Sequence, residues 1–199
     1  IVMSAITFVM MLMAGCRLLY FIVSGLILGG GGIAALAIYF TTAGESAGDA
    51  NFRLGRILNY MDPWQDPTDQ GWQTIQSLYA IGSGGVFGVG LGEGKQKYLY
   101  VSEPQNDFIF SILAEELGFV GCVVVIILFV LFIWRGIIIA MKAPDMFGSL
   151  LATGITTLVM VQVAINIAVV TNTIPNTGIS LPFFSAGGTA LIILLAMCG

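Results

Sequence analysis

Acidic residues gather where a long apolar segment begins, and they are the side chains in this sequence best suited to acid–base chemistry. Asp107 lies in the run EPQNDFIFSILAEELGF, with Glu103 shortly before it and Glu115 two helical turns after it. On a helix, Ser111 and Glu115 are rotated by about 40° and about 80° from Asp107, so the three can line one polar strip. A carboxylate on such a strip can take a proton as a general base or bind a divalent cation.

The simplest alternative is that Asp107 only caps a helix, because an acid at a helix start accepts hydrogen bonds from free backbone N–H groups. Pro104 prevents a helix from extending back through Glu103, so the apolar span is predicted to begin near Asp107. Glu115 would then lie about 12 Å deeper, at about 1.5 Å per residue, and Glu116 would point the opposite way. Ionisable groups at that depth are costly and usually face a protein interior or a wet cavity.

Composition and spacing exclude several kinds of site. The sequence has no histidine, which excludes Ser–His and Cys–His nucleophiles and the usual mixed zinc sites. The glycine run 82–94 fits no nucleotide-binding motif, since a Walker A reading needs glycine at Val89 and Ser or Thr at Gln96. Its glycines are instead predicted to permit tight turns and close backbone packing. The three cysteines are widely spaced and lie in or beside apolar runs, so they are predicted to be small buried side chains rather than a disulfide framework. No nucleic acid is predicted as a partner.

The elements that must position these residues are membrane spans. Apolar residues make up 57% and charged residues 9% of the chain, and the mean hydropathy is +0.96. Soluble domains carry about 25% charged residues, so this chain has too few charges to form a water-facing surface. We therefore expect an all-α fold, a polytopic transmembrane helical bundle that forms one integral membrane domain. A span needs about 20 apolar residues. The predicted spans are 1–14, 18–40, 108–134, 146–171 and 187–199, of which the first and last are incomplete.

Basic residues in short connectors indicate which ends of the spans face the cytoplasm. Arg17, Arg135 and Lys142 all fall on one side if the segment 41–107 does not cross the membrane. That segment is then a large extracytoplasmic loop with short interfacial helices, and it faces outward together with the uncharged loop 172–186.

Polar residues concentrate in the loop 41–107, which holds eight of the eleven acidic and four of the seven basic residues. Residues 51–61 predict an amphipathic interfacial helix, on which Arg53 contacts either anionic headgroups or a substrate diphosphate. Residues 70–92 are uncharged and long enough to span, but their glutamines and glycines make a poor lipid-facing helix. We therefore predict a helix over 68–81 and a surface or re-entrant loop after it. Trp72, Ile75 and Tyr79 form one stripe of this helix, which is predicted to serve packing or interfacial anchoring rather than sugar binding.

Four segments, in this order, resemble a known family of membrane proteins. They are DPWQDP at 62–67, GWQTIQSLYAIGSGGVFGVGLGEGKQKYLY at 71–100, EPQNDFIFSILAEELGF at 103–119 and NTGISLPFFSAGG at 176–188. From about residue 50 onward the chain resembles the SEDS family of peptidoglycan glycosyltransferases (FtsW, RodA and SpoVE). Gln105 makes it more similar to the FtsW and SpoVE branch than to RodA. Ala186 and Thr189 depart from the family pattern, in which Tyr and Ser are common.

The resemblance implies a protein of about ten helices in the bacterial cytoplasmic membrane, of which this chain is roughly the C-terminal half. It implies an enzyme, an inverting glycosyltransferase that polymerises lipid II into glycan strands during division or shape and spore formation. Asp107 is the implied catalytic residue, the base for the acceptor 4-hydroxyl. The implied partners are a class B penicillin-binding protein, which crosslinks the strands, and other cell-division proteins.

Further residues, most of them polar, are predicted to bind lipid II, a disaccharide-peptide on undecaprenyl diphosphate. They are Arg53, Lys97, Glu103, Gln105, Ser111, Glu115, Pro182 and Ser185. Lys97, Arg53 or a divalent cation, Mg²⁺ or Mn²⁺, would stabilise the departing diphosphate. The candidate ligands for such a cation are Glu103, Asp107 and Glu115.

Two other functions fit the same residues. A transporter that flips lipid II across the bilayer also needs polar residues and broken helices within the membrane. A non-catalytic divisome scaffold that recruits the transpeptidase needs only a docking surface. Polymer formation by the purified protein separates the enzyme from both alternatives.

Overall fold

The computed structural model describes residues 2–17, 60, 63–65, 71–94, 107–185 and 187–198, together with 19–31 except 21, 24 and 28. Within these ranges the chain is helical and contains no strand, which confirms the predicted all-α fold. The elements are α1 (Val2–Met13), the 3₁₀ turn η1 (Pro63–Gln65), α4 (Trp72–Gly84), α5 (Ile109–Lys142), α6 (Met146–Val170) and α7 (Gly188–Cys198).

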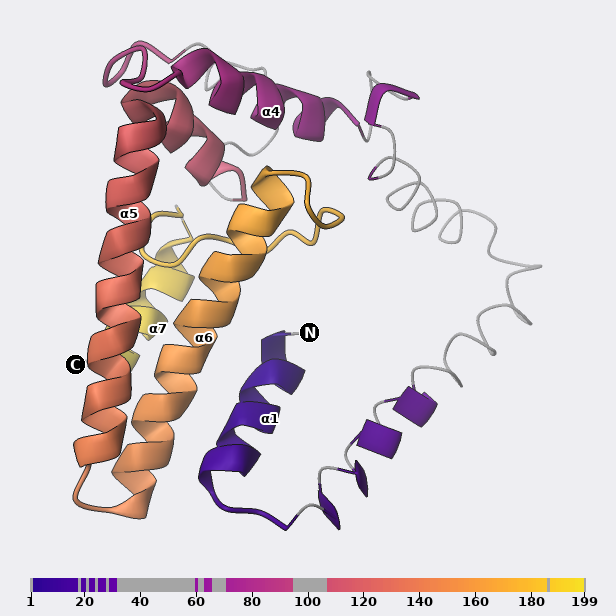
Figure 1. The fold of residues 1–199 in the computed structure, drawn as a ribbon, viewed down its shortest axis with the longest axis vertical. Helices are drawn as coiled ribbons and strands as arrows, with labels where there is room; N and C mark the ends of the chain where they lie inside the picture. Colours follow the sequence, from indigo (N-terminus) through magenta and orange to yellow (C-terminus); the bar gives the residue numbers. More distant parts are fainter. Residues whose placement is uncertain are drawn as a thin grey trace.

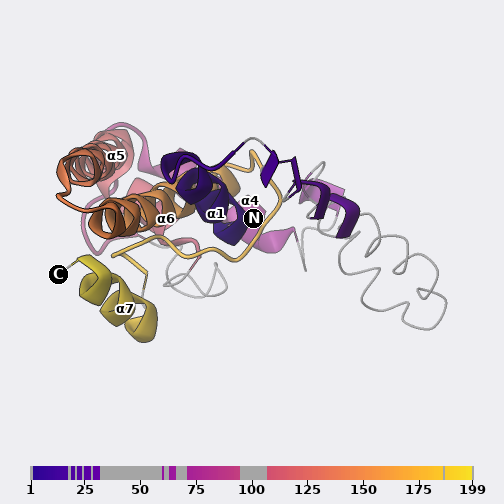
Figure 2. The same ribbon diagram turned by 90° about the horizontal axis from the view of Figure 1, so that it is seen from below.

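Helices α5 and α6 are both long and apolar enough to cross a membrane, and they lie side by side (Figures 1 and 2). Asp145 in the short connection between them caps α6, because its Oδ2 accepts a hydrogen bond from Gly148 N over 2.8 Å. The predicted span 146–171 corresponds to α6. The predicted span 108–134 corresponds to α5, but the helix continues past the exposed Arg135, because arginine favours helix and its long side chain carries the charge to the surface.

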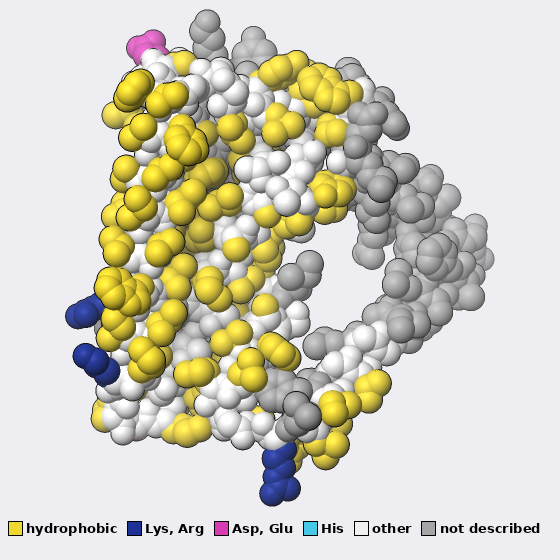
Figure 3. All heavy atoms as spheres, in the orientation of Figure 1, with side chains coloured by type: hydrophobic (Ala, Val, Ile, Leu, Met, Phe, Trp, Pro, Cys, Tyr) yellow, Lys and Arg dark blue, Asp and Glu magenta, His cyan; other side chains and the backbone are white. Residues whose placement is uncertain are grey.

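The shorter apolar helices α1 and α7 correspond to the predicted spans 1–14 and 187–199. The described residues between 19 and 31 are helical, and the rest of the predicted span 18–40 lies outside the described residues. Helix α1 packs against α6, where the Met10 sulfur lies 3.3 Å from the position that a Cβ on Gly154 would take. The described Lys and Arg side chains lie toward the end of the molecule opposite α4 (Figure 3). They are Arg17, Arg135 and Lys142.

Helix α4 lies across one end of α5 and α6, which we call the α4 end (Figure 1). The Ser77 Oγ donates a hydrogen bond to the Val170 carbonyl at the end of α6 over 3.0 Å. The buried residues of α4 are Ile75, Gln76, Ser77, Ala80 and Gly84. Of the predicted stripe Trp72, Ile75 and Tyr79, only Ile75 is among these buried residues, and the small residues beside it let α4 approach α5 closely. Tyr79 is 52% exposed and instead meets Trp64 of η1 edge to face, with ring centroids 6.0 Å apart.

Helix α5 is broken at Gly118, where φ is 67° and ψ is −167°. This conformation is essentially restricted to glycine. Figure 1 shows the chain rising from its Asp107 end to the α4 end and turning there into the long part of α5. Residues 109–117 therefore form a short helical segment inclined into the bundle. The prediction that Glu115 lies deeper than Asp107 is wrong, since the reversal puts Asp107 farther from the α4 end.

A loop rich in glycine, residues 85–94, docks onto this break, and we call it the glycine turn. Four backbone hydrogen bonds join the two segments: Val89 N to Glu115 O (3.0 Å), Gly90 N to Glu116 O (3.1 Å), Phe119 N to Gly85 O (2.9 Å) and Val120 N to Val86 O (3.1 Å). They pair backbone groups that a broken helix would leave open. A Cβ on Gly84 or Gly88 would overlap the backbone of α5, which confirms that these glycines permit close packing.

We expect Gly84→Ala to destabilise the protein, because the added methyl group would overlap the Ala114 carbonyl. Overpacking of this kind costs about 1–3 kcal/mol. Gly82→Ala is the matched control, since it lies in the same helix with nothing within 4 Å of its Cβ position. There alanine should stabilise the helix by about 0.5–1 kcal/mol. Melting temperatures in detergent should move in opposite directions, and equal shifts would contradict the close docking of α4 on α5.

Candidate active site

Asp107 lies just before α5, at the end of the short segment 109–117 that is farther from α4. The next aromatic residues, Phe108 and Phe110, are 2% and 5% exposed and anchor this end in the apolar core. Ser111 is fully buried, and its Oγ donates to the Phe108 carbonyl over 2.7 Å, so its predicted contact with substrate stays a prediction. Asp107 is half-buried, which leaves its side chain both held and accessible.

The loop between α6 and α7 approaches the same carboxylate. Gly178 has a φ of 65°, and a Cβ built on it would stand 3.5 Å from Asp107 Oδ2. The Gly178 N–H donates to Asn176 Oδ1 over 3.1 Å, and the Asn176 amide donates to Gln73 Oε1 of α4 over 3.3 Å. The first half of this loop is therefore fixed to α4 while its glycine lies against Asp107.

The second half of the loop is fixed to α5 by aromatic packing. Phe183 meets Phe132 edge to face with centroids 5.5 Å apart, and Phe184 lies 6.0 Å from Phe129. Phe183 has a φ of 65°, which is a strained value for a bulky residue and persists only where the surroundings determine it. Leu181, beside it in the loop, is 1% exposed.

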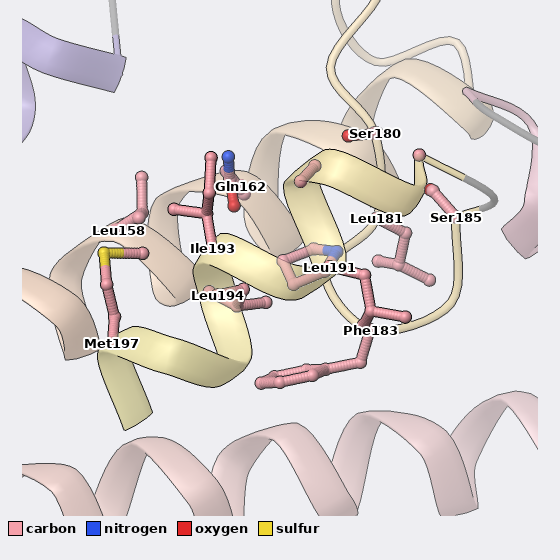
Figure 4. A pocket seen from close by; sticks show the side chains of 13 residues that line it. Leu158, Gln162, Ser180, Leu181, Phe183, Ser185, Leu191, Ile193, Leu194 and Met197 are labelled. Carbon is pink, nitrogen blue, oxygen red and sulfur yellow. The ribbon is translucent and has the colours of Figure 1, made fainter. Parts of the chain in front are cut away.

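A cavity of about 180 Å³ lies between α6, this loop and α7 (Figure 4). Pro182 and Ser185, two of the predicted substrate-binding residues, line it together with Ser180 and several apolar side chains of α7. Gln162 also lines it and was not predicted; its only sequence signal is an amide within the apolar span 146–171. The same loop thus approaches Asp107 at Gly178 and lines the cavity a few residues later.

Glu115 and Glu116 face the glycine turn. Their Oε2 and Oε1 atoms lie 3.0 Å and 3.2 Å from the position that a Cβ on Gly94 would take. Glu115 is only 3% exposed. The prediction that Glu116 points away from Glu115 is therefore wrong, because both side chains reach the glycine turn beside the Gly118 break. The predicted polar strip through Asp107, Ser111 and Glu115 stays a prediction.

Four predicted site residues lie outside the described residues, and their roles stay predictions. They are Arg53, Lys97, Glu103 and Gln105. Within the described ranges, no group of three Asp, Glu, Cys or His side chains could hold a metal ion. Of the predicted cation ligands, that statement covers Asp107 and Glu115, which lie at opposite ends of the segment 109–117.

The fold and the site together define a helical membrane protein whose acidic residue is held where an inclined helix and a polar loop meet inside the bundle. The family model for FtsW, RodA and SpoVE, described as "Cell cycle protein", matches residues 1–199, so the chain belongs to this family. The resemblance derived from the sequence is thereby confirmed.

Relatives of known name cover the whole chain. Stage V sporulation protein E of Bacillus subtilis (strain 168) is 48% identical over 198 residues, and a probable peptidoglycan glycosyltransferase FtsW of Geobacter sp. (strain M18) is 46% identical over 197. These matches cover 100% and 99% of this chain and 51% of each relative, so the chain spans about half the length of the curated relatives it matches. The similarity to the FtsW and SpoVE branch is confirmed.

A solved structure is also similar to this chain. It is named "Structural coordination of polymerization and crosslinking by a peptidoglycan synthase complex", and it aligns with a TM-score of 0.66 and 31% sequence identity. The match covers 99% of this chain and 52% of the other.

Proposed function

We propose that the protein is an inverting peptidoglycan glycosyltransferase that polymerises lipid II. The observation that carries the proposal is the half-buried Asp107, which lies beside Gly178 of a polar loop. Relatives of the chain are named probable peptidoglycan glycosyltransferases, which supports the proposal. A half-buried carboxylate is partly accessible to a substrate, and the surrounding protein restricts its orientation.

The chemistry needs one such carboxylate. Asp107 takes the proton from the acceptor 4-hydroxyl as its oxygen forms a bond to the donor sugar C1, and the C1–O bond to the diphosphate breaks with its electron pair. One displacement inverts the α-linked diphosphate to a β-1,4 bond, whereas a retaining glycosidase uses two close carboxylates because one becomes covalently attached. A positioned general base contributes about 10²–10⁴-fold to the rate.

The loop and the predicted cations complete the proposed site. Pro182 and Ser185 border the cavity beside the loop, where the disaccharide or its lipid carrier can bind. The negative charge on the departing diphosphate needs a cation to stabilise it. We propose that Lys97, Arg53 or a divalent ion, Mg²⁺ or Mn²⁺, is that cation. The described lysine and arginine side chains lie toward the opposite end of the molecule (Figure 3).

We further propose that the protein is a multi-pass component of the bacterial cytoplasmic membrane, with the α4 end facing outward. The gathering of Arg17, Arg135 and Lys142 away from α4 supports this orientation. A class B penicillin-binding protein is the proposed partner. The similarity to a structure named for a peptidoglycan synthase complex supports that pairing.

The test uses the purified full-length protein, its transpeptidase partner and fluorescent lipid II in liposomes. Glycan strands resolved on a gel are the expected product. Movement of lipid II between leaflets without polymer would overturn the proposal in favour of a flippase. Recruitment of the transpeptidase as the only activity would overturn it in favour of a scaffold.

A further inference from the structure

Asn166 of α6 bonds to both segments that form the candidate site. Its side chain is fully buried, and its Nδ2 donates one hydrogen bond to the Asp107 carbonyl and another to the Ile179 carbonyl, each 2.8 Å long. Asp107 lies 59 residues away in the sequence and Ile179 lies 13 away. One amide group therefore connects the start of α5 with the loop at Gly178.

The orientation of this amide follows from its partners. A carbonyl oxygen can only accept a hydrogen bond, so the nitrogen must face both carbonyls and use both of its N–H groups. The other amide atom, Asn166 Oδ1, is buried without a hydrogen-bond partner in the part of the chain that the structure describes. Leaving such an acceptor unsatisfied costs about 1–3 kcal/mol. A leucine of similar size would avoid that cost, so the two donors are what the asparagine contributes here.

We propose that Asn166 is a positioning residue that fixes the Asp107 carboxylate against the α6–α7 loop. The inference rests on the proposed function, because it gives Asn166 a role in the step that Asp107 performs. The asparagine bonds the main-chain carbonyl of Asp107, so it fixes the backbone that carries the carboxylate.

Two substitutions remove the donors in different ways. Asn166→Asp has the same shape but presents oxygens to two carbonyls, whereas Asn166→Leu is apolar and also removes the unsatisfied acceptor. Thr153→Val is the matched control: Thr153 is a buried polar residue of the same helix, and its hydroxyl donates to the Ser149 carbonyl within α6 over 2.8 Å.

The measurement is the initial rate of polymerisation by the full-length protein with its partner, as a function of lipid II concentration. Displacing a catalytic group by about 1 Å costs about 100-fold in rate. We expect kcat of Asn166→Asp and Asn166→Leu to fall by up to that factor, with KM nearly unchanged and Thr153→Val unaffected. Asn166→Gln, which restores both donors on a longer side chain, should recover part of kcat.

The outcomes separate this inference from the proposed function. If Asp107→Asn is inactive while folded Asn166→Leu keeps the wild-type kcat, the positioning role is overturned and the proposed function stands. If Asp107→Asn polymerises normally, the proposed function itself is overturned. If the donor-free variants do not fold, Asn166→Gln decides, because its extra methylene shifts both donors and the Asp107 carbonyl that they hold. A reduced kcat with unchanged KM supports positioning, and wild-type kcat with an unchanged pH profile contradicts the requirement for a fixed position.

Discussion

Replacing Asp107 with asparagine should reduce polymerisation of lipid II by about 10²–10⁴-fold, the usual contribution of a general base. The amide has the same shape as the carboxylate but cannot take the proton of the acceptor hydroxyl. The main-chain carbonyl of residue 107 can still accept the hydrogen bond from Asn166, so the start of α5 should keep its position. Strand formation on a gel, normalised to folded protein, measures the effect.

The same substitution separates catalysis from capping. Asparagine caps helices about as well as aspartate, so Asp107→Asn should leave activity unchanged if Asp107 only satisfies backbone N–H groups. Asp145→Asn is the matched control, because Asp145 caps α6 through its bond to Gly148 N. That variant should keep both its melting temperature and its polymer yield. Normal polymer from Asp107→Asn would remove this residue from the mechanism.

The sequence predicts the parts of this structure that depend on composition over a long window. The spans that form α5 and α6 were predicted because both segments are long and apolar enough to cross a membrane. Asp107 stands out because it lies where such a span is predicted to begin, within a motif that resembles the family. The loop with Pro182 and Ser185 stands out because prolines and glycines interrupt the apolar pattern.

The sequence does not predict features that depend on distant partners. A glycine such as Gly118 in an apolar run continues a helix or breaks it, and here the glycine turn decides by bonding the backbone on both sides of the break. Asn166 reads as one uncharged residue in a span, since nothing local indicates that its partners are Asp107 and Ile179. The depth order of Asp107 and Glu115 was wrong for the same reason.

Gly118→Ala should damage both stability and activity, more than any other glycine substitution considered. Its φ and ψ fall in a region essentially restricted to glycine, at a cost of about 1–3 kcal/mol for another residue. A Cβ there would also overlap the backbone of the glycine turn at Val86 and Gly88, and overpacking adds about 1–3 kcal/mol. The melting temperature in detergent measures the combined loss.

Two controls divide that loss into its causes. Gly85→Ala introduces backbone strain without overpacking, since the φ of Gly85 is 54° and nothing lies within 4 Å of its Cβ position. Gly82→Ala introduces neither backbone strain nor overpacking. We expect the destabilisation to decrease from Gly118→Ala to Gly85→Ala to Gly82→Ala. Polymerisation per folded molecule should fall only in Gly118→Ala, because relief of the strain requires α5 to straighten and would carry Asp107 away from Gly178. A folded Gly118→Ala protein with wild-type activity would show that the break does not position the carboxylate.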